Sequence, residues 1–481
     1  MQPTAITRRQ LLQQSGLGFG SLAVAWLSHH EQLRSEEAVA SVSAGGNRFL
    51  QPHFAPRAKA VIQLMQTGGP SQMDLFDLKP ELQKRGGEKS PLEVEKFLGG
   101  NTDQLFASPF KFARRGRCGM ELSELIPEIS TLADELCLVR SMYTGHNNHT
   151  EATVMINTGK TNMGRPALGS WISYALGSEN QNLPSFVVLR DPNKYDTAGS
   201  LSWSSGWLPA MHQGTEFSSR GAPVPNLEPS VAVPPSARKA SLDYLAKLNQ
   251  VHRERFPRES ELDARIRNYE LAARMQMAAG DVLNISNETE ATRKLYGLND
   301  PQTAPYGTRC LMARRLIESG VRFVQVFPDQ DGQAWDSHSK LPTDLPRICR
   351  KCDLPSAALI RDLKQRGLLD DTIVLWTGEF GRLPVSQNSD GRDHNQHAFS
   401  LFLAGGDFKP GFTYGKTDDF GYKAVENRVS VSDLHATLLN QLGLDHQRVT
   451  YRHHGRDETL TDAPVTNARV VADLLRSVGK A

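Results

Sequence analysis

The strongest constraint on the fold is an apolar, β-branched run at residues 372–376, which is followed by side chains that carry chemistry. Such a run predicts a buried central strand. Glu379 comes at the C-terminal end of this strand, His394 and His397 follow, and a second apolar run occupies residues 400–403. In open α/β sheets ligands bind at the C-terminal ends of strands. Carboxylate and imidazole groups at such an end therefore indicate a metal site.

A glycine-rich turn follows the first predicted strand, at residues 60–65. Gly68 and Gly69 would allow the backbone to approach an anionic group closely. A tight turn between a strand and a loop explains the same two glycines equally well. This turn alone is therefore weak evidence for a site.

A second polar cluster follows the strand predicted at residues 137–140, and it leads into a predicted helix. Thr150 stands where that helix begins, which fits an N-cap. A hydroxyl at a helix N-terminus is also well placed for a nucleophile that faces an anion. Both interpretations of Thr150 remain open from the sequence.

Asp336 and His338 follow the strand predicted at residues 321–327. Because they are two residues apart, their side chains face the same side of an extended segment, as a shared metal would need. Polar clusters thus follow four predicted strands. Four clusters at one edge of a sheet are better evidence for a site than any one alone.

The alternation of strands and helices predicts an α/β fold, with a mostly parallel central sheet and helices on both faces. Helices are predicted at residues 167–176, 308–319, 345–366 and 431–442. Residues 122–132 are amphipathic, and Pro127 is expected in the first turn of a helix there. The 481 residues suffice for one large α/β domain with insertions or for two ordinary domains.

A loop-rich insertion interrupts the domain at about residues 191–300. Residues 191–235 contain five prolines after residue 222, which is typical of a lid, a binding loop or a disordered segment. Residues 236–279 are charged and have helical periodicity, so they predict two helices.

The N-terminus predicts export. Arg8 and Arg9 precede a mildly hydrophobic stretch at residues 11–27, as in a bacterial twin-arginine signal. A single membrane anchor is the alternative, but the stretch is short and contains glycine and glutamine. We expect a signal segment at residues 1–35, a linker at residues 36–56 and a periplasmic protein. Membrane association is expected, if at all, through the N-terminal segment.

Composition excludes some classes of partner and scaffold. The net charge of +2 favours no nucleic acid or other polyanionic partner. The five cysteines are few and odd in number, which argues against a disulfide scaffold. Cys349 and Cys352 form a C-x-x-C in a predicted helix, without the second pair that a zinc ribbon needs.

The order of these motifs resembles the alkaline phosphatase and sulfatase superfamily. Residues 366–382 resemble its helix-to-strand link before an Asp-His-Gly metal motif, and residues 397–411 resemble its later histidine, strand and Pro-Gly. Residues 152–159 resemble the helix that follows its nucleophile. The chain is also similar to an uncharacterised, often twin-arginine-exported branch, over nearly everything after residue 50.

This resemblance implies an alkaline-phosphatase-like fold and a metal-dependent hydrolase of sulfate or phosphate esters. The substrate would be a small-molecule or glycan anionic ester, and the cofactor a divalent metal, with Ca, Zn, Mg or Mn all open. The candidate metal ligands are carboxylates and imidazoles near the strand ends: Asp336, His338, Glu379, His394, His397 and Asp74.

The sequence departs from the superfamily at the nucleophile and at one metal ligand. The Cys or Ser followed by x-Pro-x-Arg is absent, and either His149 or Thr150 takes the nucleophile position. The Asp-His pair is replaced by Glu379 and Phe380, so one imidazole is gone. Glu379 is then a ligand, a general base or a group that holds a ligand in place.

Two arginines are candidates for binding the anionic oxygens of a substrate. Arg382 and Arg392 would do so with two parallel hydrogen bonds, although a structural role is equally consistent with the sequence. The alternative function is a non-catalytic binding or structural protein on the same fold, with a degenerate metal site.

Overall fold

The computed structural model describes residues 50–191, 197–219, 234–256, 260–328 and 335–477. The predicted twin-arginine segment and most of the predicted linker lie outside the described residues, as do parts of the loop-rich stretch. The predicted division of the chain into signal, linker and domain stays a prediction.

A nine-stranded sheet forms the centre of the described structure, in the order β14-β5-β13-β9-β1-β8-β6-β7, with β17 paired to β5. Its strands are β1 (Ala60–Met65), β5 (Leu136–Tyr143), β6 (Phe186–Arg190), β7 (Thr215–Ser218), β8 (Phe323–Val326), β9 (Thr372–Thr377), β13 (Phe399–Ala404), β14 (Phe412–Tyr414) and β17 (Val429–Ser430). Only β13 is antiparallel to its neighbours among these described strands.

The central strands are buried on both faces, as their uninterrupted apolar sequences predict. In β1 the side chains of Ile62 and Leu64 enter one core, and those of Val61 and Met65 enter the other. This alternation follows from the two-residue period of a strand. The sheet therefore separates two hydrophobic cores.

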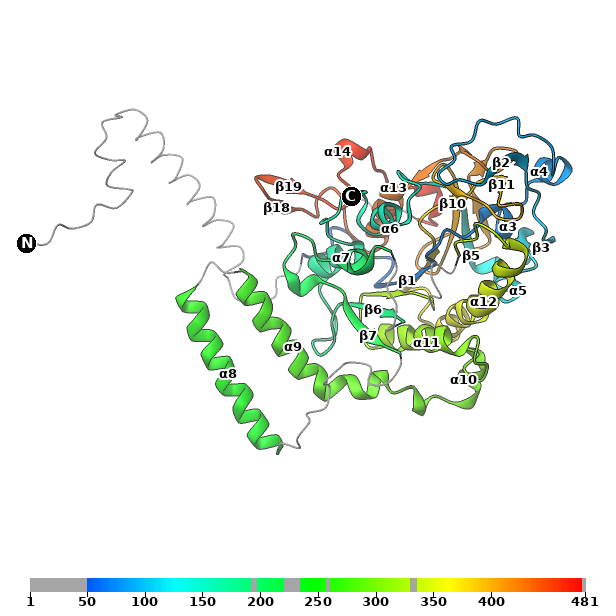
Figure 1. Ribbon diagram of the computed structural model, residues 1–481. Helices are drawn as coiled ribbons and strands as arrows, with labels where there is room; N and C mark the ends of the chain where they lie inside the picture. Colours follow the sequence, from blue (N-terminus) through cyan, green and yellow to red (C-terminus); the bar gives the residue numbers. More distant parts are fainter. Residues whose placement is uncertain (1–49, 192–196, 220–233, 257–259, 329–334, 478–481) are drawn as a thin grey trace, which may run out of the picture.

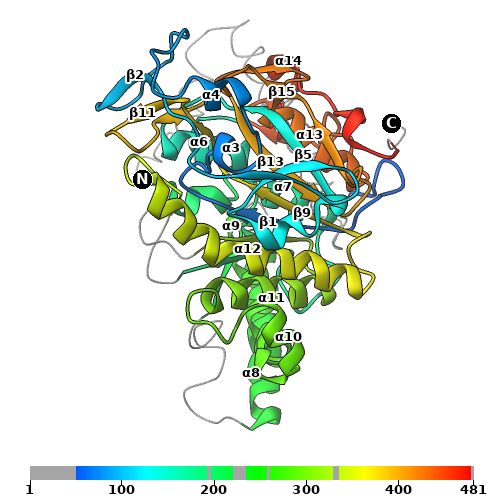
Figure 2. The same ribbon diagram turned by 90° about the vertical axis from the view of Figure 1, so that its right-hand side faces the viewer.

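Helices cover both faces of the sheet. One core contains side chains from α5 (Pro127–Ser130), α11 (Ala304–Glu318) and α12 (Leu341–Gln365). The other contains side chains from α6 (His149–Thr158), α7 (Leu168–Leu176) and α13 (Val431–Gln441). Figure 2 shows α12 running beneath the central strands with α11 next to it. The predicted α/β fold, with a mostly parallel sheet and helices on both faces, is confirmed.

Shorter elements connect these layers. They are α3 (Gln72–Leu75), α4 (Pro80–Lys84), β2 (Asn101–Leu105), β3 (Phe112–Arg115), β4 (Met120–Ser123), α10 (Glu290–Leu295), β10 (Gly381–Arg382), β11 (Val385–Gln387), β12 (His394–Asn395), β15 (Lys416–Thr417), β16 (Ala424–Glu426), β18 (Tyr451–His453), β19 (Arg456–Glu458) and α14 (Ala463–Thr466).

The helix predicted in the amphipathic stretch at residues 122–132 begins at Pro127, as expected, but is shorter than that stretch. Of residues 122–132 only Pro127–Ser130 are α-helical, and Leu122 belongs to β4, which pairs with β3. Both parts bury their apolar side chains in the same core, so their periodicity alone does not separate them. Proline lacks an amide hydrogen and suits the first helical position, which explains why the helix begins at Pro127.

The predicted pair of helices in the insertion is confirmed as α8 (Pro235–Arg255) and α9 (Ser260–Leu283). Figure 1 shows α8 projecting away from the sheet. The loop-rich stretch before them also contains the edge strand β7, which was not predicted from the sequence. Within the described residues, none of the helices combines the length and apolarity that crossing a bilayer requires.

A buried histidine in α13 makes folding sensitive to acid. Nε2 of His435 donates a hydrogen bond to the carbonyl oxygen of Ile156 at 2.9 Å, while Nδ1 has no partner among the described residues. A second proton on this ring would be buried without an acceptor. Burial therefore lowers the pKa of His435 to about 4.

We expect the free energy of unfolding to fall as the pH decreases from 6.5, the ordinary pKa of histidine, towards 4. The unfolded chain takes up a proton in this window that the folded state resists, at a cost of about 3 kcal/mol when complete. In His435→Gln, which keeps a donor but does not titrate, denaturant unfolding at each pH should show a shallower dependence. The exposed His252→Gln is the control, and an unchanged slope in His435→Gln would contradict this expectation.

Candidate metal centre

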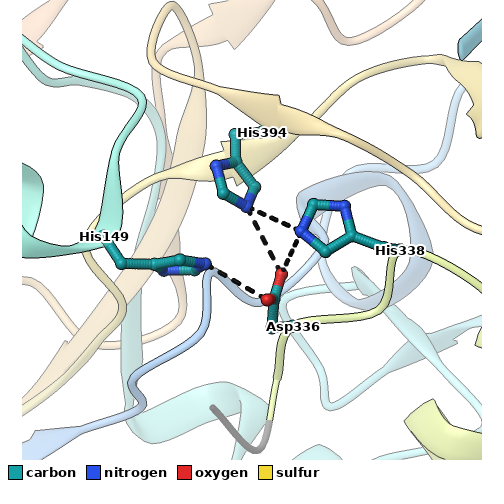
Figure 3. Close-up of side chains that lie close together, drawn as sticks. All are labelled: His149, Asp336, His338 and His394. Atoms are coloured by element: carbon teal, nitrogen blue, oxygen red, sulfur yellow. Dashed lines mark hydrogen bonds and ion pairs between the residues drawn. The ribbon is translucent and has the colours of Figure 1, made fainter. Parts of the chain in front are cut away.

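Four side chains from three parts of the chain meet beyond the C-terminal ends of the central strands (Figure 3). His149 lies in the first turn of α6, Asp336 and His338 lie in the segment after β8, and His394 lies in β12. One potential ligand atom from each residue lies within 4.8 Å of all the others.

Asp336 is the common neighbour of the three histidines. Its Oδ1 lies 2.9 Å from Nε2 of His338 and 3.4 Å from Nε2 of His394. Its Oδ2 lies 3.4 Å from Nε2 of His149. Nε2 of His394 and Nε2 of His338 are 3.0 Å apart. In Figure 3 all three rings turn one nitrogen towards the carboxylate.

The outer nitrogen of each ring is held by an oxygen acceptor. Nδ1 of His149 lies 2.6 Å from Oε1 of Glu379, and Nδ1 of His338 lies 2.6 Å from Oε1 of Gln387. Nδ1 of His394 lies 2.6 Å from the carbonyl oxygen of Asn147. Because these oxygens only accept, each Nδ1 carries the donated proton. In the neutral imidazole this leaves the lone pair on Nε2.

The orientation of Gln387 supports this assignment. Its Nε2 donates to the carbonyl oxygen of Gly99 at 2.8 Å, which leaves its Oε1 to accept from His338. Acceptors of this kind fix the tautomer and direction of metal-binding histidines in proteins. All three histidines therefore present Nε2 to the same point.

The cluster fits a bound cation. Neutral His338 and His394 would direct two lone pairs at each other and at the Asp336 carboxylate, which is repulsive without a positive charge between them. Nε2 of His149 is buried and makes no hydrogen bond in the described structure. A tetrahedral ion with bonds of 2.0–2.1 Å places its ligand atoms roughly 3.3 Å apart. Four spacings within the cluster, of 2.9 to 3.4 Å, are close to that value. The whole set of ligand atoms lies within 4.8 Å.

Electrostatics keep Asp336 ionised and His394 neutral. Burial alone would raise the pKa of Asp336, but the positive charge of Arg382 and, after it, the three neighbouring histidines hold this pKa far below its usual range. Burial lowers the pKa of His394 to about 4 despite the nearby Asp336, and the positive charge of Arg382 adds to this effect. Burial also opposes the charged form of His149, yet Asp336 and Glu379 raise its pKa.

Arg382 is committed to internal contacts. Its Nη2 donates to Oδ1 of Asp336 at 2.7 Å and to the carbonyl oxygen of Gly68, its Nε to Gly69 at 2.9 Å, and its Nη1 to the carbonyl oxygen of Arg392 at 3.0 Å. Only 1% of its side chain is exposed. The geometry thus gives Arg382 the task of holding Asp336.

Asp74 and Arg392 form a separate, fully buried ion pair. Nε and Nη2 of Arg392 donate to the two carboxylate oxygens of Asp74 at 2.8 and 3.2 Å. Both side chains are 0% exposed. The structure therefore places Asp74 outside the cluster, against the segment that carries His394.

Glu379 lies behind His149. Its Oε1 accepts from Nδ1 of His149 and from the amide of Gly68 at 2.9 Å. Gly68 has a φ of 112°, and a Cβ there would lie 2.7 Å from the backbone nitrogens of Trp335 and Asp336. Glycine is therefore required where the β1 turn packs between Glu379 and the Asp336 segment.

Two further predicted residues lie outside the cluster. Nε2 of His397 is 2.9 Å from Oε2 of Glu95, and this histidine is about one-third exposed. The N-cap interpretation of Thr150 is wrong, because Asn148 is the N-cap of α6 and its side chain accepts from the amide of Thr150. Thr150 follows the cluster residue His149 in the first turn of α6.

Sequence reasoning considered His149 only for the nucleophile position and did not predict it among the metal ligands. Its ring packs against Phe380, with the two centroids 4.7 Å apart. The ring of Phe380 also lies 4.5 Å from that of His394. An imidazole from α6 thus lies beside the position at which the resemblance expects one. The missing imidazole at position 380 was a signal that a histidine from elsewhere in the chain, such as His149, could take its place.

Residues 58–475 match the family described as "Protein of unknown function (DUF1501)". The chain belongs to this family. No curated protein matches its sequence.

Several solved structures are similar to the chain at low identity. The PsFucS1 sulfatase from Pseudoalteromonas sp. is 12% identical, over 88% of this chain and 73% of that one, with a TM-score of 0.37. The phosphonate monoester hydrolase SpPMH from Silicibacter pomeroyi is 12% identical, over 87% and 76%, with a TM-score of 0.33. A protein in the alkaline phosphatase superfamily from Vibrio parahaemolyticus is 11% identical, over 84% and 74%, with a TM-score of 0.35.

At these identities and TM-scores the likeness supports no conclusion about activity. The function is therefore inferred from this chain's own residues. Membership of a twin-arginine-exported branch of the superfamily stays a prediction.

The histidines at positions 394 and 397 provide a matched test of the cluster. We expect His394→Ala to weaken zinc binding by more than about 100-fold. Even the loss of a group that only hydrogen-bonds to a metal-binding histidine typically lowers metal affinity about 10- to 100-fold. His397→Ala, three residues along the same segment, should bind zinc like the wild type. Competition with a chromophoric chelator measures both affinities. Equal loss in the two variants would contradict the geometric assignment.

Proposed function

We propose that the protein is a metal-dependent hydrolase of sulfate or phosphate esters, acting on a small-molecule or glycan substrate. The observation that carries this proposal is the convergence of three imidazole Nε2 atoms and one carboxylate at the C-terminal edge of the sheet. Ligand sites in α/β sheets occur at this edge. The motif resemblance in the sequence supports the choice of ester.

The cluster is accessible from one side. His394 is 2% exposed, while the side chains of Asp336 and His338 are 18% and 23% exposed. A substrate would therefore approach over Asp336 and His338, with His394 and His149 forming the closed side. Catalytic zinc centres leave a coordination position for water or substrate, so an ester oxygen would bind as a fifth ligand on this exposed side.

The donor set favours zinc among the metals left open by the sequence. Three imidazole nitrogens and one carboxylate suit zinc, whereas calcium and magnesium prefer oxygen ligands. His149, His338, His394 and Asp336 would hold the ion. When bound, it would polarise an ester oxygen and offset the negative charge that develops there.

The chain's own groups have distinct roles in this proposal. Arg382 orients Asp336, and the three outer acceptors orient the histidines. Thr150 is the candidate nucleophile, because its hydroxyl belongs to the first turn of α6 immediately after His149. Export through the predicted signal at residues 1–35 is part of the same proposal and would place the reaction in the periplasm.

A structural metal site is the second candidate. Four protein ligands are typical of closed structural zinc sites. In addition, Arg382 and Arg392 are both buried in internal hydrogen bonds, so neither meets the expectation that it binds substrate oxygens. Under this alternative zinc would raise stability without supporting turnover.

A panel of aryl phosphate, phosphodiester and aryl sulfate substrates tests the proposal. We expect turnover of at least one ester by the zinc-loaded wild type, and none above background in His338→Ala. Thr150→Val should lose roughly 10³-fold or more in kcat if its hydroxyl attacks, while Thr150→Ser should retain activity.

Two results separate the candidates. Zinc-dependent stabilisation without turnover of any ester would overturn the hydrolase proposal and favour the structural site. Full activity in Thr150→Val would remove Thr150 from the mechanism and leave the metal-dependent part of the proposal standing.

A further inference from the structure

Glu379 differs from the other two groups that hold the histidines. Gln387 and the carbonyl of Asn147 are neutral acceptors, whereas Glu379 is an acidic side chain that is 0% exposed. Its Oε1 receives two hydrogen bonds, and its Oε2 is buried with no hydrogen-bond partner in the described structure. A buried carboxylate with an unpartnered oxygen is costly unless a positive charge lies nearby.

The net charge of the cluster with a bound ion indicates that a second negative group is needed beside it. Asp336 already pairs with Arg382, which is almost fully buried. A divalent ion at the cluster would leave the site with an excess of buried positive charge, because one carboxylate would serve both Arg382 and the ion. Glu379 is a second carboxylate beside the cluster and is fully buried, and it makes its contact through His149.

Geometry argues against Glu379 as a ligand. It binds Nδ1 of His149, while Nε2 on the far side of the same ring lies 3.4 Å from Asp336. The imidazole therefore separates Glu379 from the centre of the cluster. The four-residue group whose ligand atoms converge does not include Glu379.

We propose that Glu379 is a positioning residue and counter-ion for the metal: it directs Nε2 of His149 inward and balances the ion's charge through the ring. This inference rests on the metal site of the proposed function. Gly68 is part of the same arrangement, because its amide fixes the carboxylate oxygen that accepts from His149.

Two substitutions of Glu379 separate its effect on the orientation of His149 from the effect of its negative charge. Glu379→Gln keeps an oxygen that accepts from His149 but removes the charge, and Glu379→Ala removes both. We expect zinc affinity, measured by chelator competition, to fall about 10-fold in Glu379→Gln and about 100-fold in Glu379→Ala. Gln387→Ala is the matched control for loss of a neutral acceptor, and its loss should be smaller than that of Glu379→Ala.

Cobalt(II) substitution tests whether Glu379 is itself a ligand of the metal. The visible spectrum of Co(II) reports the number and type of its ligands. In Glu379→Gln the spectrum should match that of the wild type, although more cobalt is needed to saturate the site. A changed spectrum would make Glu379 a ligand and overturn the inference. Zinc affinity equal to the wild type in Glu379→Gln would also overturn it.

The zinc-loaded wild type provides a measurement that needs no Glu379 variant. With ¹⁵N-labelled histidine, the spectrum should contain a strongly hydrogen-bonded Nδ1 proton that disappears in His149→Ala. Its absence from the wild type would overturn the inference even if the variants fail to fold. If the zinc-loaded wild type hydrolyses no ester but the predicted zinc affinities and spectra are observed, only the proposed hydrolase function is contradicted. A wild type that binds no zinc would overturn both.

Discussion

The contact between Asp336 and Arg382 is the interaction on which the site depends. Arg382 donates to Asp336 and to the turn after β1, and it is almost completely buried. This fixes a carboxylate, with its pKa held far below the usual range, at the point where three histidines converge. Burial opposes the ionised form of Asp336, and Arg382 is the largest of the contributions that outweigh it. A neutral carboxyl would be a poor partner for either imidazolium or metal.

The sheet makes this convergence possible. β1, β5, β8 and β9 end at the same edge, so the segments after them meet although they are far apart in the sequence. The turn after β1 can pack closely against the Asp336 segment because only glycine fits at position 68, between that segment and Glu379. Outer acceptors then set the direction of each imidazole. Fold, packing and protonation state thus act together on four side chains.

Much of this was predictable from residue patterns. The strand at Ala60–Met65 and the polar residues after β8 and β9 follow from apolar runs and their ends. The antiparallel direction of β13 and the partners of Asp74 and His397 do not, because they depend on pairings between distant segments. The contact of Asn147 with His394 could not be predicted either, because Asn147 contributes its backbone carbonyl, which every residue has. Asp74 is an example: its place after a strand predicts a metal ligand, but in the structure its carboxylate pairs with the buried Arg392.

Anomalous diffraction from zinc-soaked crystals tests most directly whether these four residues form a metal centre. A single strong peak is predicted, bonded to Nε2 of His149, His338 and His394 at about 2.0–2.1 Å and to the carboxylate of Asp336. Glu379 should remain on Nδ1 of His149 without touching the ion. An empty cluster at saturating zinc, or a peak held instead by His397 and Glu95, would contradict the account.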